Sequence, residues 1–147
     1  MIKIPEPDYA IYRQWFERSL DLIWHLSPEL RAYGDPMDAV AKAEAISKAR
    51  AVKSVSAGIT DTVAMTQGFS QQEVASADEA FVREGLPSLT AMRALLSKDI
   101  AKIFKAGAIT NEDEYYALKA LEDAEMAEAT RAEIQQLIGD YETRLSS

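Results

Sequence analysis

Apolar residues recur at intervals of three and four along most of the chain, the spacing that places side chains on one face of an α-helix. The two clearest stripes consist of Tyr12, Phe16, Leu20 and Ile23, and of Leu89, Met92, Leu96, Ile100 and Ile103. No segment alternates convincingly between apolar and polar residues, as a half-buried β-strand would. The pattern therefore predicts an all-α protein, a bundle of about five to six helices.

A strong helix start stands at Asp35, which suits the N-cap position and is followed by proline at the first helical position. The alanine-rich segment 37–58 is expected to form one helix from this start. Gly58 and the β-branched residues after it lower helix propensity, so the helix could end there or continue with a bend. We predict that it continues through residues 57–67.

Three further helices are indicated by their boundary residues. Ser70 and Glu73 have the spacing of a capping box, in which each side chain accepts a hydrogen bond from the other residue's backbone N–H. The helix that begins at Leu89 is expected to end at Gly107, since glycine favours the left-handed conformation after a helix. A final helix is predicted over residues 126–145.

The composition is that of a packed globular protein. The chain has 147 residues, of which 48% are hydrophobic and 27% charged. This length suffices for one domain with its own core, so residues 1–147 are expected to form a single domain. There is no cysteine, which excludes disulfides, thiolate metal sites and cysteine nucleophiles. We predict no cofactor.

The first ten residues, MIKIPEPDYA, lack the basic head and apolar stretch of a secretory signal. No apolar run approaches the roughly 20 residues that cross a bilayer as a helix. We therefore expect a soluble cytoplasmic protein without a membrane partner.

The formal net charge of −8 is unevenly distributed. Residues 1–56 carry 8 basic and 8 acidic side chains, whereas residues 57–147 carry 8 basic and 16 acidic ones. An acidic field repels nucleic acid and attracts basic proteins. The main basic cluster, Lys42, Lys48, Arg50 and Lys53, is interrupted by Glu44 and lacks neighbouring aromatic residues, so we predict no nucleic-acid partner.

The segment AGAITNEDEYYALKALEDAE, residues 106–125, is the most distinctive in the chain. Thr110 and Asp113 fit a capping pattern, and three consecutive acids in the first turn complement the helix dipole. A calcium loop that began at Asn111 would need glycine at its sixth position, which is Tyr116. A helix start is the favoured interpretation. Tyr116 is expected to face the core, which leaves Tyr115 partly exposed.

Two metal-dependent classes can be compared with the sequence. A ferritin-like di-iron site needs two Glu-x-x-His pairs, but the chain has one histidine, His25. Glu122, Glu125 and Glu128 resemble one half of the acidic helix motif with which MazG-type nucleotide pyrophosphohydrolases hold magnesium. That family's second acidic motif is absent, because Glu133 is followed three residues later by glutamine. We predict no metal site and no catalytic residue.

These observations favour a protein-binding module, of inhibitor, immunity or regulatory-adaptor type, which occludes or tethers a basic protein partner. The expected binding residues are Glu112, Asp113, Tyr115, Glu122, Glu125 and Glu128, with the tyrosine as aromatic anchor. Two alternatives stay open. One is an all-α nucleotide hydrolase that uses a divalent metal, and the other is a helical subunit that assembles with itself as a homo-oligomer.

Overall fold

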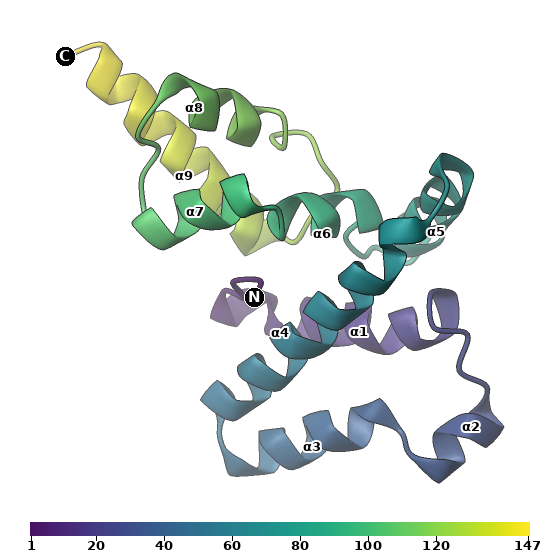
Figure 1. Ribbon diagram of the computed structural model, residues 1–147. Helices are drawn as coiled ribbons and strands as arrows, with labels where there is room; N and C mark the ends of the chain where they lie inside the picture. The colour runs from purple at the N-terminus through teal and green to yellow at the C-terminus, as the bar shows by residue number, and fades with distance from the viewer.

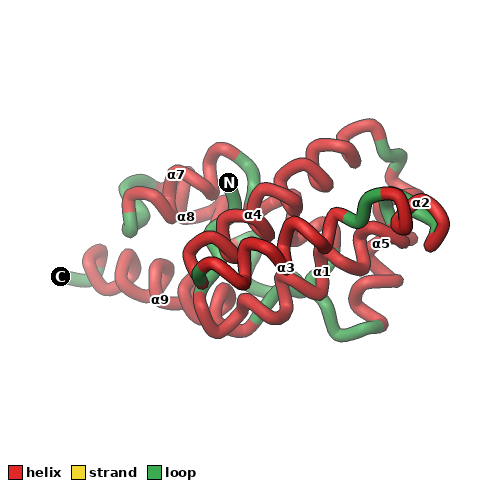
Figure 2. The backbone as a smooth tube through the Cα atoms, turned by 90° about the horizontal axis from the view of Figure 1, so that it is seen from below, coloured by secondary structure: helices red, strands yellow, loops and turns green.

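The computed structural model describes all residues, 1–147, and contains helices without any strand (Figure 1, Figure 2). The α-helices are α1 (Tyr9–Leu22), α2 (Pro28–Tyr33), α3 (Pro36–Ile46), α4 (Lys48–Met65), α5 (Gln71–Arg83), α6 (Leu89–Leu95), α7 (Lys98–Ala106), α8 (Glu112–Lys119) and α9 (Glu128–Leu145). Two 3₁₀ turns are η1 (Glu6–Asp8) and η2 (Thr66–Gly68). The all-α prediction is confirmed. The predicted number of helices is wrong, since there are nine α-helices.

One of the additional helices arises because the predicted helix from Asp35 divides at Ser47. Ser47 has an extended backbone, with φ −168° and ψ 161°, and it ends α3 and begins α4. Its N–H donates to the Ala43 carbonyl, and its hydroxyl accepts from the Arg50 N–H at 3.1 Å. One serine therefore caps both helices, and the chain reverses there into a hairpin.

Serine side chains account for the other two extra helices. Ser97 accepts a hydrogen bond from the Ile100 N–H and begins α7, which divides the predicted Leu89–Gly107 helix. Ser27 accepts from the Leu30 N–H and begins the short helix α2. Serine at an N-cap can satisfy the first orphan N–H groups of a helix, so a single residue suffices to interrupt a long apolar pattern.

The predicted continuation past Gly58 is correct, because α4 runs without a break to Met65. The glycine lies where α4 crosses α1. A Cβ atom at Gly58 would stand 2.6 Å from the ring of Phe16. The absent side chain thus lets the two helices approach closely, which compensates for the low helix propensity of glycine.

The helices form stacked layers, seen from the side in Figure 1 and from below in Figure 2. The lowest layer contains α2 and α3, α1 and α4 lie above it, and α6 to α9 form the top. Helix α5 lies beside α1 and α6 at the right of Figure 1. Trp15 joins these parts in the core, since its ring stacks on Phe81 at 4.7 Å and its indole N–H donates to the Pro87 carbonyl.

Asp8 links the first turn of the chain to the last helix. Its buried carboxylate accepts hydrogen bonds from the N–H groups of Ala129 and Thr130 and from the Thr130 hydroxyl, at 2.8 to 3.0 Å. Ala127, at the N-cap of α9, supplies no capping side chain. Asp8 also stands at the N-cap of α1, but its side chain makes no capping hydrogen bond there and instead caps α9.

Candidate functional site

The six predicted binding residues do not form one surface. Glu112 and Asp113 stand at the start of α8, whereas Glu122 and Glu125 follow its end. The eight residues of α8, roughly 12 Å along the helix axis, separate the two groups. The predicted acidic face therefore consists of two acidic sites at opposite ends of α8.

The cap of α8 differs by one residue from the predicted one. Asn111, rather than Thr110, occupies the N-cap and accepts a hydrogen bond from the Glu114 N–H at 2.9 Å. The carboxylate of Glu114 turns back and accepts from the Thr110 N–H and hydroxyl, both at 2.9 Å. These hydrogen bonds, with Lys102 nearby, lower the pKa of Glu114. Because Glu114 performs the role expected of Asp113, the exposed carboxylates of Glu112 and Asp113 are not used in the cap.

The two tyrosines have exchanged their expected positions. Tyr115 is half-buried, its ring lies 5.2 Å from that of Tyr141, and its hydroxyl donates to Glu142 at 2.7 Å. Tyr116 is 60% exposed and packs edge-on against Tyr115 at 5.4 Å. The prediction that Tyr116 faces the core is wrong, because α9 lies on the Tyr115 side of α8. The exposed aromatic ring is Tyr116.

The three glutamates of the MazG-like pattern do not share a helix face. Glu122 lies in a turn, Glu125 in the connection between α8 and α9, and Glu128 in the first turn of α9. Arg131 holds this connection by donating to the carbonyls of Glu122 and Ala124 at 2.8 and 2.7 Å. No three histidine, aspartate or glutamate side chains anywhere in the chain are arranged to hold a metal ion. The geometry that the resemblance implies is not formed.

The acidic excess is concentrated in the last quarter of the chain. Residues 107–147 carry ten acidic and three basic side chains, which gives this part a net charge of −7. Glu122 is paired with Lys119 at 2.8 Å, and Glu133 is paired with Lys3. Exposed acids of this part that form no salt bridge include Glu112, Asp113, Asp123, Glu125, Glu128 and Asp140. The negative field therefore projects from α8 and from the connection that follows it.

The turn between α3 and α4 has the opposite charge. Residues 41–54 carry four basic side chains and one acidic one, and almost all of them are exposed. The acid, Glu44, accepts hydrogen bonds from Tyr9 and Arg13. At the end of α3, Ile46 is 67% exposed. We call Lys42, Ile46, Lys48, Arg50 and Lys53 the basic tip.

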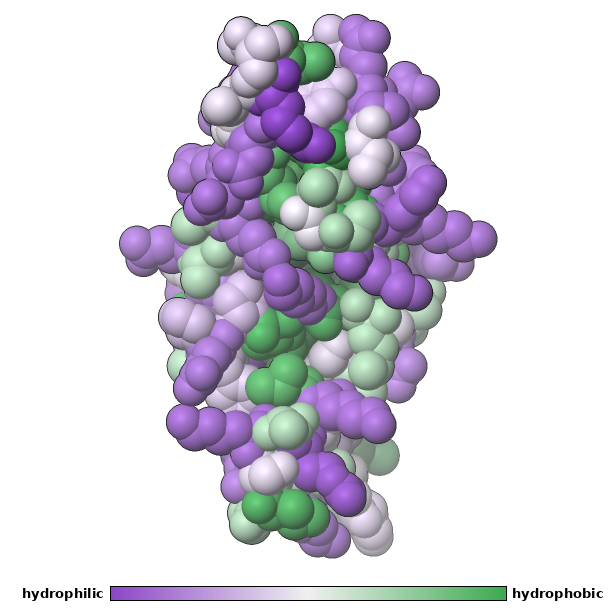
Figure 3. Space-filling model, turned by 90° about the vertical axis from the view of Figure 1, so that its left-hand side faces the viewer, coloured by the Kyte–Doolittle hydropathy of each residue, from purple (hydrophilic) through white to green (hydrophobic).

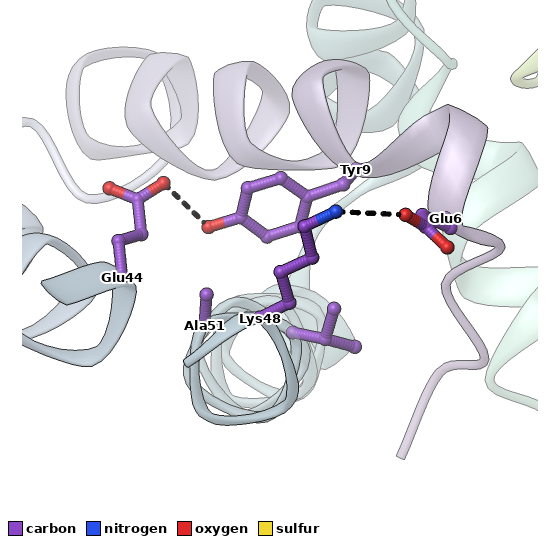
Figure 4. A pocket seen from close by; sticks show the side chains of 6 residues that line it. Glu6, Tyr9, Glu44, Lys48 and Ala51 are labelled. Atoms are coloured by element: carbon purple, nitrogen blue, oxygen red, sulfur yellow. Dashed lines mark hydrogen bonds and ion pairs between the residues drawn. The ribbon is translucent and has the colours of Figure 1, made fainter. Parts of the chain in front are cut away.

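A groove of about 360 Å³ lies between the basic tip and the start of α1 (Figure 4). Tyr9 lines it and donates to Glu44 at 2.8 Å, while Lys48 reaches across to Glu6 at 3.2 Å. Burial, followed by the hydrogen bond and charge of Glu44, raises the pKa of Tyr9 to about 12. The polar groups of this groove satisfy one another, so its geometry does not specify a ligand.

His25 borders a second groove, of about 460 Å³, beside α5. It has a left-handed backbone, with φ 54°. This conformation follows the end of α1 and lets the Leu26 N–H donate to the Leu20 carbonyl at 2.8 Å. Histidine takes here the position that glycine commonly occupies after a helix. The conformation of His25 is thus explained by the ending of the helix.

Comparison with known proteins finds no matching family model, no matching curated protein and no matching solved structure. None of the helices combines the length and the apolar character needed to cross a membrane.

Proposed function

We propose that this protein is a cytoplasmic binding module that recognises a basic protein partner through the exposed face of α8. It would act as an inhibitor, an immunity-type protein or a regulatory adaptor by occluding or tethering that partner. The observation that carries the proposal is the exposed ring of Tyr116, with the carboxylates of Glu112 and Asp113 beside it.

These three side chains form a coherent surface. Glu112 and Asp113 precede Tyr116 by four and three residues, the spacings that place residues side by side on a helix. The ring of Tyr116 is supported edge-on by Tyr115, which is itself fixed to α9 through Glu142. An aromatic residue on a rigid support presents contact area at low cost in conformational entropy.

The chemistry of this face suits lysine and arginine. Carboxylates form charge-assisted hydrogen bonds with these side chains, and the face of a tyrosine ring attracts cations. The charge of −7 on residues 107–147 would accelerate the encounter with a basic partner. Glu122, Glu125 and Glu128 would add to this long-range attraction from the other end of α8, and they are not part of the contact.

Two matched triple variants test the proposal. The site variant is Glu112→Gln, Asp113→Asn and Tyr116→Ala. The control variant is Glu29→Gln, Asp38→Asn and Tyr33→Ala, which also changes one glutamate and one aspartate in first helical turns and one exposed tyrosine. Both variants raise the net charge by two.

The wild type and both variants are immobilised at equal density, and the captured host proteins are quantified by mass spectrometry. A basic protein that the wild type and the control capture, and that the site variant loses, would support the proposal. Equal capture of every basic protein by all three chains would contradict it. Melting temperatures of the three chains show whether any loss reflects unfolding.

A further inference from the structure

The molecule carries two exposed ends of opposite charge, and each presents a large side chain. The basic tip holds Ile46, which is 67% exposed, and four exposed basic side chains. The start of α8 holds Tyr116, which is 60% exposed, and the exposed acids Glu112 and Asp113. Neither Ile46 nor Tyr116 contributes to the core, so both side chains are free to contact a second molecule.

Both ends lie on the same side of the molecule. In Figure 1 the turn between α3 and α4 is at the lower left, and the start of α8 is at the upper left. Figure 3 faces this side and shows apolar residues along its midline, bordered by hydrophilic residues. The side therefore has an apolar middle with a basic end below and an acidic end above.

We infer that a second copy of this chain covers this side in an antiparallel dimer. A twofold axis that lies in the contact plane, at right angles to the line joining the two ends, turns this side of one copy toward the same side of the other. It also exchanges the two ends, so each basic tip meets the α8 face of the other copy. The same rotation places the two apolar midlines against each other. Such a self-complementary contact closes after two copies and is the commonest symmetry of homo-oligomers.

The inference deepens the proposed function, on which it rests, by naming the basic partner as the basic tip of an identical chain. Charge complementarity selects this occupant. The tip has four cations, of which Lys48 pairs with Glu6, and one acid, which pairs with Arg13, whereas residues 107–147 have a charge of −7. Nucleic acid would match the tip alone and would be repelled by the acidic end of the same side.

Two charge-reversed chains provide the test. The tip variant is Lys42→Glu, Arg50→Glu and Lys53→Glu, which leaves the pair between Lys48 and Glu6 in place. The α8 variant is Glu112→Lys and Asp113→Lys. In the tip variant both ends are acidic. In the α8 variant the two side chains beside Tyr116 are basic like the tip, and the charge of residues 107–147 falls from −7 to −3. Each variant alone should therefore repel its own copies, while the two variants together restore both contacts.

Mass is measured by analytical ultracentrifugation for the wild type, for each variant and for their equimolar mixture. The measurements are made at low salt and at chain concentrations up to about 100 μM, at which a dimer with a Kd in the micromolar range is populated. We expect a wild-type dimer of twice the mass of one chain. The dimer of each variant alone should have a Kd roughly 100-fold higher than that of the wild type, because like charges face each other. The mixture should recover the dimer.

Three results would overturn the inference. They are a wild-type chain that stays monomeric, a mass that grows beyond the dimer, and a dimer that charge reversal leaves unchanged. A monomeric wild type that still captures a basic protein through α8 would reject the dimer and keep the proposed function. If the α8 variant melts far below the wild type, the salt dependence of the wild-type Kd replaces it. A Kd that does not rise with salt would then contradict the inference.

Discussion

The two helical hairpins, α3–α4 and α8–α9, turn in different ways. In α3–α4 the turn is one residue, Ser47, whose hydrogen bonds go to Ala43 and Arg50 only a few positions away. In α8–α9 the turn occupies residues 120–127 and is held by Arg131 and by Ser88, whose N–H donates to the Glu125 carbonyl. The first hairpin is fixed locally, and the second depends on distant parts of the chain.

The two kinds of turn differ in which side chains they leave exposed and in how they depend on the rest of the fold. A tight turn that satisfies its own backbone leaves the side chains around it available, as in the basic tip. A long turn that is fastened by tertiary hydrogen bonds becomes stable only when the whole fold is present. We therefore expect changes near α9 to affect global stability more than equivalent changes near α3.

The largest loss of stability is expected in the hydrophobic core, to which the N-terminal half of the chain contributes Phe16 and the C-terminal half contributes Ile100. Phe16→Ala and Ile100→Ala empty buried positions in the single hydrophobic cluster, so each should cost about 2–5 kcal/mol. Urea unfolding followed by circular dichroism measures the loss. If the two halves formed separate cores, either variant would produce a second transition, which would contradict the single domain that the sequence predicts.

Two aspartate caps give the next largest contrast. Asp8→Ala removes a buried carboxylate from the start of α9 and leaves two N–H groups without partners, so we expect a loss of about 3 kcal/mol. Asp35→Ala removes a local and partly exposed cap from α3 and should cost about 1 kcal/mol. If the two variants lose the same free energy of unfolding in chemical denaturation, a cap from a distant residue does not stabilise the fold more than a local cap does.

Two helical glycines, Gly58 in α4 and Gly139 in α9, should respond to alanine in opposite ways. Gly58→Ala would press a methyl group against Phe16 and should destabilise the protein by about 2 kcal/mol. Gly139→Ala meets no atom within 4 Å and should stabilise it by about 0.5 kcal/mol, since alanine favours a helix. Thermal melts of the two variants should shift in opposite directions. A melting temperature that Gly58→Ala leaves unchanged or raises would show that the crossing of α1 and α4 does not require glycine.

A smaller effect is expected at high pH. Burial raises the pKa of Tyr12 to about 12, and the charge of Asp8 contributes to the increase. The folded state therefore holds this proton more tightly than the unfolded state, and stability is lost as the pH rises above about 10. The loss attributable to Tyr12 should reach about 1 kcal/mol near pH 11. Tyr12→Phe should make the unfolding free energy fall less steeply between pH 9 and 11 than in the wild type, and an unchanged slope would contradict the assignment.

The sequence was most informative where a side chain acts on neighbouring residues. Asp35 caps α3, and Ser70 and Glu73 form the predicted capping box at the start of α5. Ser47 and Ser97 also act locally, as N-caps of α4 and α7. The apolar pattern continues past both residues, so it did not indicate that a new helix begins there. Serine is common both inside helices and at their caps, so its type alone does not decide between the two roles.

At the candidate site, contacts between residues far apart in the sequence decide which side chains are buried. Which tyrosine of α8 is buried depends on the position of Tyr141 in α9, more than 20 residues later. Likewise, Asp8 is paired with a helix that starts 120 residues beyond it. Periodicity identifies the apolar faces of helices, but the choice of partner for each face belongs to tertiary packing. The sequence correctly predicted an acidic first turn for α8, but the prediction of which tyrosine is exposed was wrong.

We propose that the face formed by Glu112, Asp113 and Tyr116 recognises a basic protein surface. The most direct test of this proposal is the association rate of the purified partner, or of a second copy of the chain, at low and high salt. The site variant should associate more slowly than the wild type at low salt, and the difference should shrink at high salt, while the control variant at Glu29, Asp38 and Tyr33 behaves like the wild type. Equal association rates for the two triple variants at low salt would contradict the claim.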